Sequence, residues 1–380
     1  MNLRHAIVPR VVGVACVLTL GACGGGGGGG SSATPQMATA LTDAALVSDG
    51  VIAAAHTDSN LQNAWGLAAA PGGPFWVADN NSNKATLYDG SGTPQALVVS
   101  FPAGINGPAN PTGQVFNGTN DFVITTTTGS APAQFIYSGE GGTITAWAQT
   151  VSGSSATVAY DDGAGGAVYK GLALANNGTA NHLYATDLHN AKIDVFDTQF
   201  HKVTLSGTFA DPMIPAGFAP FNIVELNNQL WVTYAKQDAT AHDETLGAGL
   251  GYVNVFDNNG TLVKRFASAG VLNAPWGIAV APAGFGAVAN MLLIGNFGDG
   301  AINSFDPVSG QSMGSVTLAS GNKLVVPGLW ALAFGNGSNN QAASSLFYTA
   351  GPTNQVDGVF GRIDAVMMSA APPPCTGYGC

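Results

Sequence analysis

The sequence predicts an all-β fold, a six-bladed β-propeller of four-stranded antiparallel blades whose ring is closed by the N-terminal strand. Three observations predict it. Only 9% of the 380 residues are charged, and three Glu stand beside nineteen Asp, whereas helical surfaces are rich in Glu, Lys and Arg. Glycine supplies 53 positions and proline 20, as expected of many short strands joined by turns. A recurring phrase also appears six times, and internal repeats of this length are typical of propellers.

Each repeat consists of three short runs of alternating apolar residues, which predict strands where Gly, Asn and Asp turns separate them. The first repeat covers residues 63–68, 75–79 and 85–90, and in the weaker second repeat the middle strand is assigned to 122–124. The equivalent positions lie 47 to 58 residues apart, at Gly66, Gly113, Gly171, Asn222, Gly277 and Ala331. Blades of this kind bury their faces only by packing against one another around an axis.

A fourth run follows each repeat, as at 96–101 and 203–209, except after the last one. Residues 45–48, ahead of the first repeat, have the composition of the missing strand. We therefore expect the start of the chain to pair with the last blade, which removes a strand edge. A pair of two-sheet sandwiches would also have short, evenly spaced strands and is the alternative fold.

The N-terminal segment predicts export. In residues 1–22, two Arg precede an apolar run that ends in small residues, as in a bacterial signal peptide. Residues 20–23 (Leu-Gly-Ala-Cys) resemble a lipobox, and this resemblance implies cleavage before Cys23 and acylation of that cysteine. It also implies a lipid anchor in the outer membrane, on its periplasmic or surface side. Plain secretion or an uncleaved anchor is the alternative. Residues 23–43 are assigned to a Gly/Ser-rich tether and 44–368 to the propeller.

The Pro/Cys-rich tail, residues 369–380, contains the last two cysteines. Cys375 and Cys380 are close enough in sequence for a short disulfide loop in an exported protein. A two-cysteine metal site is less favoured, because no His accompanies the pair.

The charge balance excludes nucleic-acid binding. The formal net charge is −11, and the Lys and Arg residues are scattered rather than gathered in a stripe. We expect membrane contact through the lipid anchor only, and a monomer, since ring closure leaves no obvious edge for pairing. The sequence contains no zinc-protease or nucleophile-elbow motif, so cofactors and catalytic residues remain unassigned.

Propeller topology places the candidate site. With strands a to d running outward from the axis, the b–c turns and d–a loops share one face, and most polar residues fall there. The candidate ligand-binding residues are Asp58, Asn63, Trp65, Asp79, Asn81, Asp187, His189, Asn190, Asp238, His242, Asn273, Trp276, Asn296, Asp299 and Trp330. They predict a shallow polar pocket with an aromatic floor near the axis. Alternatively, the Asp and Asn residues only form turns and the Trp residues only pack between blades.

The longest b–c insertion, residues 238–244, is the densest cluster of charge in the chain. Its His and carboxylates could hold a hard divalent cation, although the spacing matches no calcium loop. A solvated loop is the alternative.

Several phrases resemble known repeats. The NHL repeat is resembled by residues 65–67, 76–79 and 301–306. The chain from residue 46 to residue 364 also resembles a family of exported bacterial six-bladed propellers. The most specific matches to that family are residues 73–79, 234–238 and 249–257. The resemblance implies the fold and export but no reaction. Some other propellers are metal-dependent lactonases with a Glu near the axis; here Glu225 falls inside a strand and no axial Glu is expected.

Two functions follow from these observations. The first is a lipid-anchored module of the cell envelope that binds a glycan, peptide or protein on its loop face. The second is a metal-dependent extracytoplasmic hydrolase or lactonase, with Asp79, Asp187, Asp299 and His189 as candidate ligands. A purely structural surface role is the remaining alternative.

Overall fold

The computed structural model describes residues 39–367, in which β-strands dominate. The helical elements of this part of the chain are the single turn α1 (Pro352–Gln355) and the 3-10 turns η1 (Gly163–Gly165) and η2 (Gly286–Val288). No helix within it has the length and apolar character needed to cross a membrane. The predicted signal peptide, Cys23, Cys375 and Cys380 lie outside the described residues.

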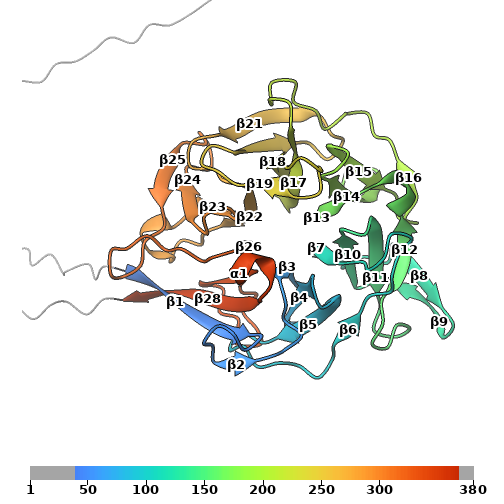
Figure 1. The fold of residues 1–380 in the computed structure, drawn as a ribbon, viewed down its shortest axis with the longest axis horizontal. Coiled ribbons are helices and arrows are strands. Elements are labelled where there is room, and N and C mark those ends of the chain that lie inside the picture. Colours follow the sequence, from blue (N-terminus) through green and yellow to red (C-terminus); the bar gives the residue numbers. More distant parts are fainter. Residues whose placement is uncertain (1–38, 368–380) are drawn as a thin grey trace, which may run out of the picture. The chain divides into compact units, whose positions relative to one another are not determined.

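Six blades follow one another around a ring, as predicted (Figure 1). Blade 1 contains β3 (Ala64–Ala69), β4 (Phe75–Asp79), β5 (Lys84–Tyr88) and β6 (Val99–Ser100). Blade 2 contains β7 (Pro111–Phe116), β10 (Phe135–Gly139), β11 (Thr143–Trp147) and β12 (Thr157–Asp161). Blade 3 contains β13 (Tyr169–Asn176), β14 (Asn181–Asp187), β15 (Lys192–Phe196) and β16 (Lys202–Val203).

The second half of the ring repeats this order. Blade 4 contains β17 (Phe218–Leu226), β18 (Gln229–Gln237), β20 (Gly251–Phe256) and β21 (Leu262–Ser268), and β19 (Glu244–Thr245) pairs with β18. Blade 5 contains β22 (Pro275–Val280), β23 (Leu292–Asn296), β24 (Ile302–Phe305) and β25 (Ser312–Ser315). Blade 6 contains β26 (Leu329–Phe334), β27 (Ser345–Ala350), β28 (Val359–Met367) and, as its outer strand, β1 (Thr39–Ser48).

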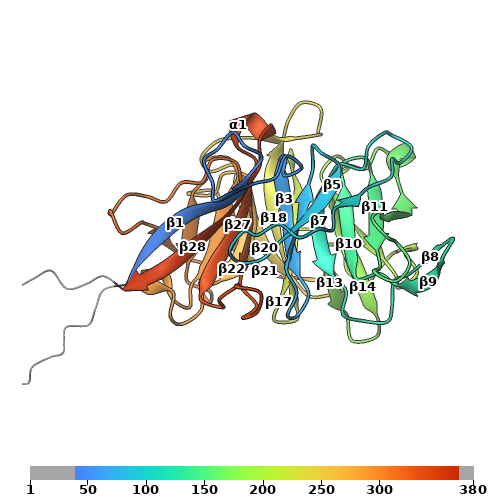
Figure 2. The same cartoon turned by 90° about the horizontal axis from the view of Figure 1, so that it is seen from below.

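The start of the chain closes the ring, as predicted. β1 pairs antiparallel with β28, with Val47 opposite Phe360, and the two strands run side by side in both views (Figures 1 and 2). Strand β1 begins at Thr39, so it includes the last five residues of the segment assigned to the tether. The short strand β2 (His56–Thr57) adds to the outside of β1 in parallel.

The small residues of the repeat allow the inner strands to meet at the axis. A Cβ on Gly66 would lie 2.4 Å from the carbonyl oxygen of Thr112, and one on Gly113 would lie 2.5 Å from the amide nitrogen of Leu172. Both contacts fall far inside van der Waals distance. Any side chain at these positions would therefore push neighbouring blades apart, which explains why the repeat carries Gly there.

Hydroxyl groups on the second strands of some blades tie those blades to the inner strand of the next. The side chain of Thr186 donates to the carbonyl oxygen of Phe221 at 2.8 Å, and that of Thr349 donates to the carbonyl oxygen of Trp65 at 2.5 Å. Six apolar clusters fill the six interfaces between blades, and a seventh, mainly aromatic, fills the axis. The blades therefore hold the inner ends of their strands in fixed positions.

The strand assignment in blade 2 was wrong. Residues 122–124 are not its second strand: β8 (Val123–Thr126) pairs with β9 (Gly129–Pro132) in a separate hairpin, and β10 takes the second position. The alternating apolar residues of this hairpin resemble those of a blade strand, which misled the alignment. The outer strands predicted at 96–101 and 203–209 are also shorter in the structure. In blade 1 only β6 pairs with β5, and in blade 3 only β16 pairs with β15.

Candidate functional site

Each inner strand carries one residue at an equivalent position, and four of these six residues belong to the aromatic cluster at the axis. This residue directly precedes the equivalent positions of the repeat and is Trp65, Thr112, Lys170, Phe221, Trp276 or Trp330. Four of the six are aromatic, and the described part of the chain has one lysine at this position.

The tryptophans fill the axis. Trp330 stacks on Trp65, with ring centroids 3.5 Å apart, and on Phe297, with ring centroids 4.0 Å apart. Trp276 meets Trp65 edge-on at a centroid distance of 5.0 Å. The three Trp side chains are at most 1% exposed. They therefore form a buried plug, and the predicted aromatic floor offers no open ring face to a ligand.

Lys170 places a positive charge directly against this plug. Its side chain is 0% exposed, and its Nζ donates a hydrogen bond to Glu140 Oε1. The same Nζ lies 3.3 Å from Asp243 Oδ1 and 4.9 Å from the ring centroid of Trp65. Burial alone would lower the pKa of Lys170, but the charges of Glu140, Glu244 and Asp243 outweigh it and raise that pKa above its ordinary value. The site therefore contains a permanent ammonium ion.

Glu140 connects the ammonium to the plug through a chain of amides. It lies in the turn between β10 and β11, and its Oε2 accepts a hydrogen bond of 2.9 Å from Asn80 Nδ2. Asn80 Oδ1 accepts from Asn63 Nδ2 at 3.3 Å, and Asn63 Oδ1 accepts from Trp330 Nε1 at 3.1 Å. Because Asn63 and Asn80 are both buried, these bonds fix the position of the carboxylate.

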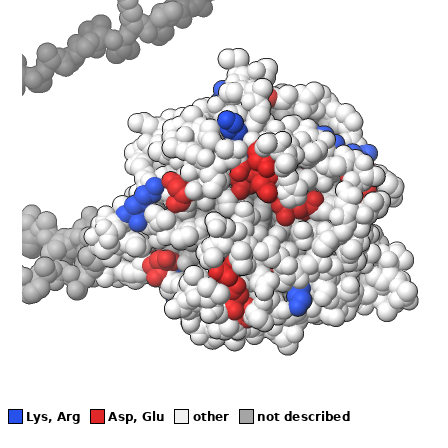
Figure 3. Space-filling view, in the orientation of Figure 1, with Lys and Arg blue, Asp and Glu red and all other residues white. Residues whose placement is uncertain are grey.

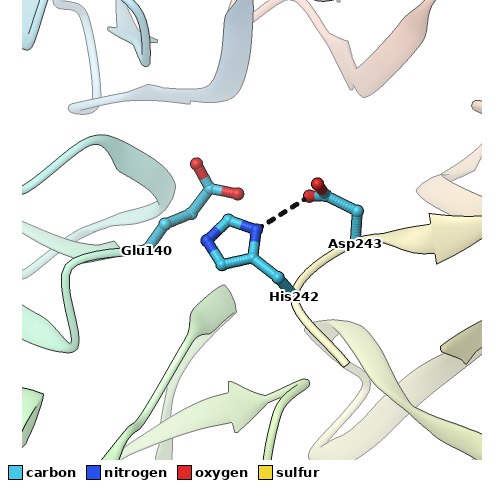
Figure 4. Close-up of side chains that lie close together, drawn as sticks. All are labelled: Glu140, His242 and Asp243. Carbon is cyan, nitrogen blue, oxygen red and sulfur yellow. Dashed lines mark ion pairs between the residues drawn. The ribbon is translucent and has the colours of Figure 1, made fainter. Parts of the chain in front are cut away.

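The long insertion of blade 4 supplies the second acidic group. His242 Nδ1 lies 3.2 Å from Asp243 Oδ1, and Glu140 faces the same imidazole ring from the other side (Figure 4). The hydrogen bond from His242 lowers the pKa of Asp243 to about 2, and the same bond raises the pKa of His242. Asp238 shapes this loop, since its Oδ1 accepts from the backbone amides of Thr240 and His242.

Glu244 is the buried member of the group. Its side chain is 9% exposed, and its Oε2 has no hydrogen-bond partner among the described residues. Burial raises its pKa to about 7, although the ammonium of Lys170 acts in the opposite direction.

A hollow of about 630 Å³ opens beside this cluster. Its wall presents one carboxylate, two imidazoles and two side-chain amides, together with backbone groups. The lining residues are Asn106, Pro108, Asn110, Glu140, Gly141, Gly166, Ala167, Val168, His189, Thr240 and His242. All of these belong to b–c turns or d–a loops, so the hollow lies on the loop face. Acidic side chains gather near the middle of the face seen in Figure 3, where basic ones are few.

The structure brings only some of the predicted site residues together. His189 and His242 line the hollow, and Asn63 belongs to the amide chain beneath it. Asn81 is exposed and donates to the carbonyl oxygen of Gln355 at 2.6 Å. Asp238 acts within its own loop.

Four other predicted residues hold turns or neighbouring loops in place. Asp58 accepts from Tyr88 Oη, Asp187 accepts from Asn190 Nδ2, Asn273 accepts from the amide of Gly247, and Asn296 donates to Asp299. The metal-ligand set Asp79, Asp187, Asp299 and His189 is not assembled. The group of metal-ligand type found in residues 39–367 is Glu140, His242 and Asp243, whose ligand atoms lie within 4.8 Å of one another.

The sequence did not indicate Glu140, Lys170 or Asn80. The insertion 238–244, which was a candidate cation site, contributes His242, Asp243 and Glu244 to the group. The expectation that no Glu lies at the axis was wrong, because Glu140, in the turn between β10 and β11, contacts Lys170 beside the axial tryptophans. Lys170 had a usable signal: it stands where other repeats have Trp. A charged residue at a position of the repeat that is otherwise aromatic or small indicates a polar centre at the axis.

Asp79 is a buried carboxyl and allows a test by pH. Both of its oxygens are inaccessible and without a hydrogen-bond partner among the described residues, and burial raises its pKa well above the ordinary value. Above pH 4 the unfolded chain releases this proton while the folded chain keeps it, so stability falls by about 1.4 kcal/mol per pH unit until the folded pKa is reached. We expect Asp79→Asn to raise the melting temperature at pH 7.5 and to change it little at pH 4. An equal shift at both pH values would contradict this assignment.

The sequence comparisons place the chain in a family. Protein R648 of Acanthamoeba polyphaga mimivirus is 34% identical over 351 residues, which covers 90% of this chain and 85% of the viral protein. The chain belongs to the R648 family. Protein L690 of the same virus is 33% identical over 84% of both chains and is a second relative.

These comparisons support the fold but not the predicted bacterial family. No family model matches the chain, and the R648 family relatives are viral, so the NHL repeat and the exported bacterial family stay predictions. Among solved structures, the soluble aldose sugar dehydrogenase of Escherichia coli covers 86% of this chain and all of its own, with a TM-score of 0.50 and 11% identity. This likeness shows the propeller fold.

Proposed function

We propose that the protein binds a small, hydroxyl-rich ligand that carries a protonated amine, such as an amino sugar, in the hollow at its loop face. The observation that carries this proposal is the carboxylate of Glu140, which opens onto a hollow of about 630 Å³. That volume lies within the usual range of small-molecule sites.

The wall of the hollow suits such a ligand. Each carboxylate oxygen can accept more than one hydrogen bond, so Glu140 can accept from an amine while it holds Lys170 and Asn80. His189, Asn106 and Asn110 offer acceptors and donors for hydroxyl groups. The excess of acidic over basic side chains near the middle of the face in Figure 3 favours a cation over an anion.

Calorimetric titration of the full chain with glucosamine, and with glucose as the neutral counterpart, tests the proposal. We expect glucosamine to bind more tightly than glucose, and Glu140→Gln to weaken glucosamine binding about tenfold while glucose binding changes less. His189→Ala leaves Lys170 untouched and is expected to weaken both sugars a few-fold. Equal affinities for both sugars, unaffected by Glu140→Gln, would contradict the proposal.

A matched control uses the same substitution elsewhere. Glu225 is exposed and lies near the end of β17, next to the turn into β18 on the opposite face, where it accepts from the amide of Asn228. Glu225→Gln removes the same charge from the protein. We expect it to leave both affinities unchanged, which separates the local contact from the effect of net charge.

Export and acylation at Cys23 belong to the same proposal. An anchored propeller would present its loop face to ligands outside the cytoplasm. The support for this is the sequence of residues 1–23, and it does not depend on the site.

The second candidate function, metal-dependent hydrolysis, is favoured by the group Glu140, His242 and Asp243. A carboxylate pair with an imidazole is a donor set for Mn²⁺ or Zn²⁺. Two of the three members, however, already bind the ammonium of Lys170.

A further inference from the structure

We propose that Lys170 is the resident cation of the axial site: its ammonium takes the position of a divalent metal ion, and its removal creates a metal site. This inference is independent of the ligand proposed for the neighbouring hollow. It concerns how the acidic groups of the site are neutralised.

The first support is the placement of Lys170. Its Nζ contacts an oxygen of Glu140 and lies 3.3 Å from an oxygen of Asp243, and these two carboxylates come from blades 2 and 4 while the lysine comes from blade 3. A metal ion bridging the same two oxygens would have to stand where the ammonium stands. Ammonium and metal ion therefore exclude each other at this point.

The second support is the surplus of donors around one lysine. The imidazole of His242 shares the space between Glu140 and Asp243, and the ligand atoms of all three lie within 4.8 Å of one another (Figure 4). Glu244 is more than nine-tenths buried, keeps an unpartnered oxygen and lies close enough for its charge to act on Lys170. An ammonium has three donors and one charge, so it cannot satisfy all these groups.

The repeat provides the third support. The residues equivalent to Lys170 in the other blades are Trp65, Thr112, Phe221, Trp276 and Trp330, none of which is charged. The carboxylates thus gather around the one blade whose axial residue is a cation. Without this ammonium, three buried or half-buried carboxylates would require another cation.

Manganese binding to Lys170→Met tests the inference. The full-chain variant, the wild type and the charge-preserving Lys170→Arg are titrated with MnCl₂ by calorimetry and in thermal melts, with KCl at equal ionic strength as the salt control. We expect Lys170→Met to bind one Mn²⁺ at least ten times more tightly than the other two proteins, and only its melting temperature to rise with MnCl₂.

A second variant keeps the test decisive if Lys170→Met folds poorly. Lys170→Met combined with Glu244→Gln has one acid fewer and is expected to keep the gain in Mn²⁺ affinity, whereas Lys170→Met combined with Glu140→Gln is expected to lose it. Recovery of soluble Lys170→Met only when MnCl₂ is present also supports the inference. Absence of any gain in both Lys170→Met and its Glu244→Gln form, or equally tight binding by the wild type, would overturn it. Glucosamine takes no part in these measurements, so their outcome is separate from that of the proposed function.

Discussion

We expect Lys170→Met to lower the free energy of unfolding by about 3–5 kcal/mol at pH 7.5, in the absence of divalent metal ions. Methionine preserves much of the length of the side chain, but the charge and the contact of Nζ with the Trp65 ring are lost. Glu140 and Asp243 would then lose their ammonium partner, and removing one partner of a buried ion pair costs more than the pair contributes. Four blades meet at this point, so the loss acts on the whole ring.

Urea unfolding monitored by Trp fluorescence measures this loss. Because the pKa of Glu244 is about 7 even beside the ammonium, its carboxyl is protonated at pH 5.5, and the variant should lose less stability there than at pH 8. Lys236→Met, which removes an exposed lysine of β18, should change stability by less than about 0.5 kcal/mol. A loss of similar size in both variants would show that Lys170 has no special role.

Trp330→Ala is the second large effect: we expect a loss of about 3–5 kcal/mol. The ring is fully buried, lies between Trp65 and Phe297, and meets Trp276 edge-on. Its removal leaves a cavity at the axis, where the six inner strands are already at their closest approach and cannot collapse further. The substitution also frees Asn63 Oδ1, the first link of the chain to Glu140.

Trp330→Phe separates these two contributions. It keeps an aromatic ring in the plug but loses the 3.1 Å bond to Asn63, so we expect a smaller loss, of about 1–2 kcal/mol. Calorimetric melting of the two variants and the wild type gives the comparison. If Trp330→Ala were no more destabilising than Trp330→Phe, the plug would not be the packing centre of the ring.

The architecture could be predicted because it depends on patterns that recur. Gly66 and Gly113 stand at equivalent positions because neighbouring backbones approach there, and residues 45–48 read as the missing outer strand because the last repeat lacks one. The error in blade 2 has the same origin. The β8–β9 hairpin has the alternation of a blade strand, and only pairing across the blade shows that β10 holds the second position.

The site was less predictable because its contacts join residues far apart in the chain. Lys170 lies 30 residues from Glu140 and 73 from Asp243, and no local spacing relates them. Loop topology was enough to indicate His189, His242 and Asn63. It could not distinguish them from Asp187 or Asn296, which have the same residue types but serve their own turns.

A crystal structure of the full chain grown with glucosamine at pH 7.5 would show whether an amino sugar occupies the hollow beside Glu140. We expect density for the sugar in the hollow, with its amine within hydrogen-bond distance of Glu140, and Lys170 Nζ still between Glu140 and Asp243. Sugar bound elsewhere with the hollow filled by water alone, or a metal ion in place of the ammonium, would contradict it.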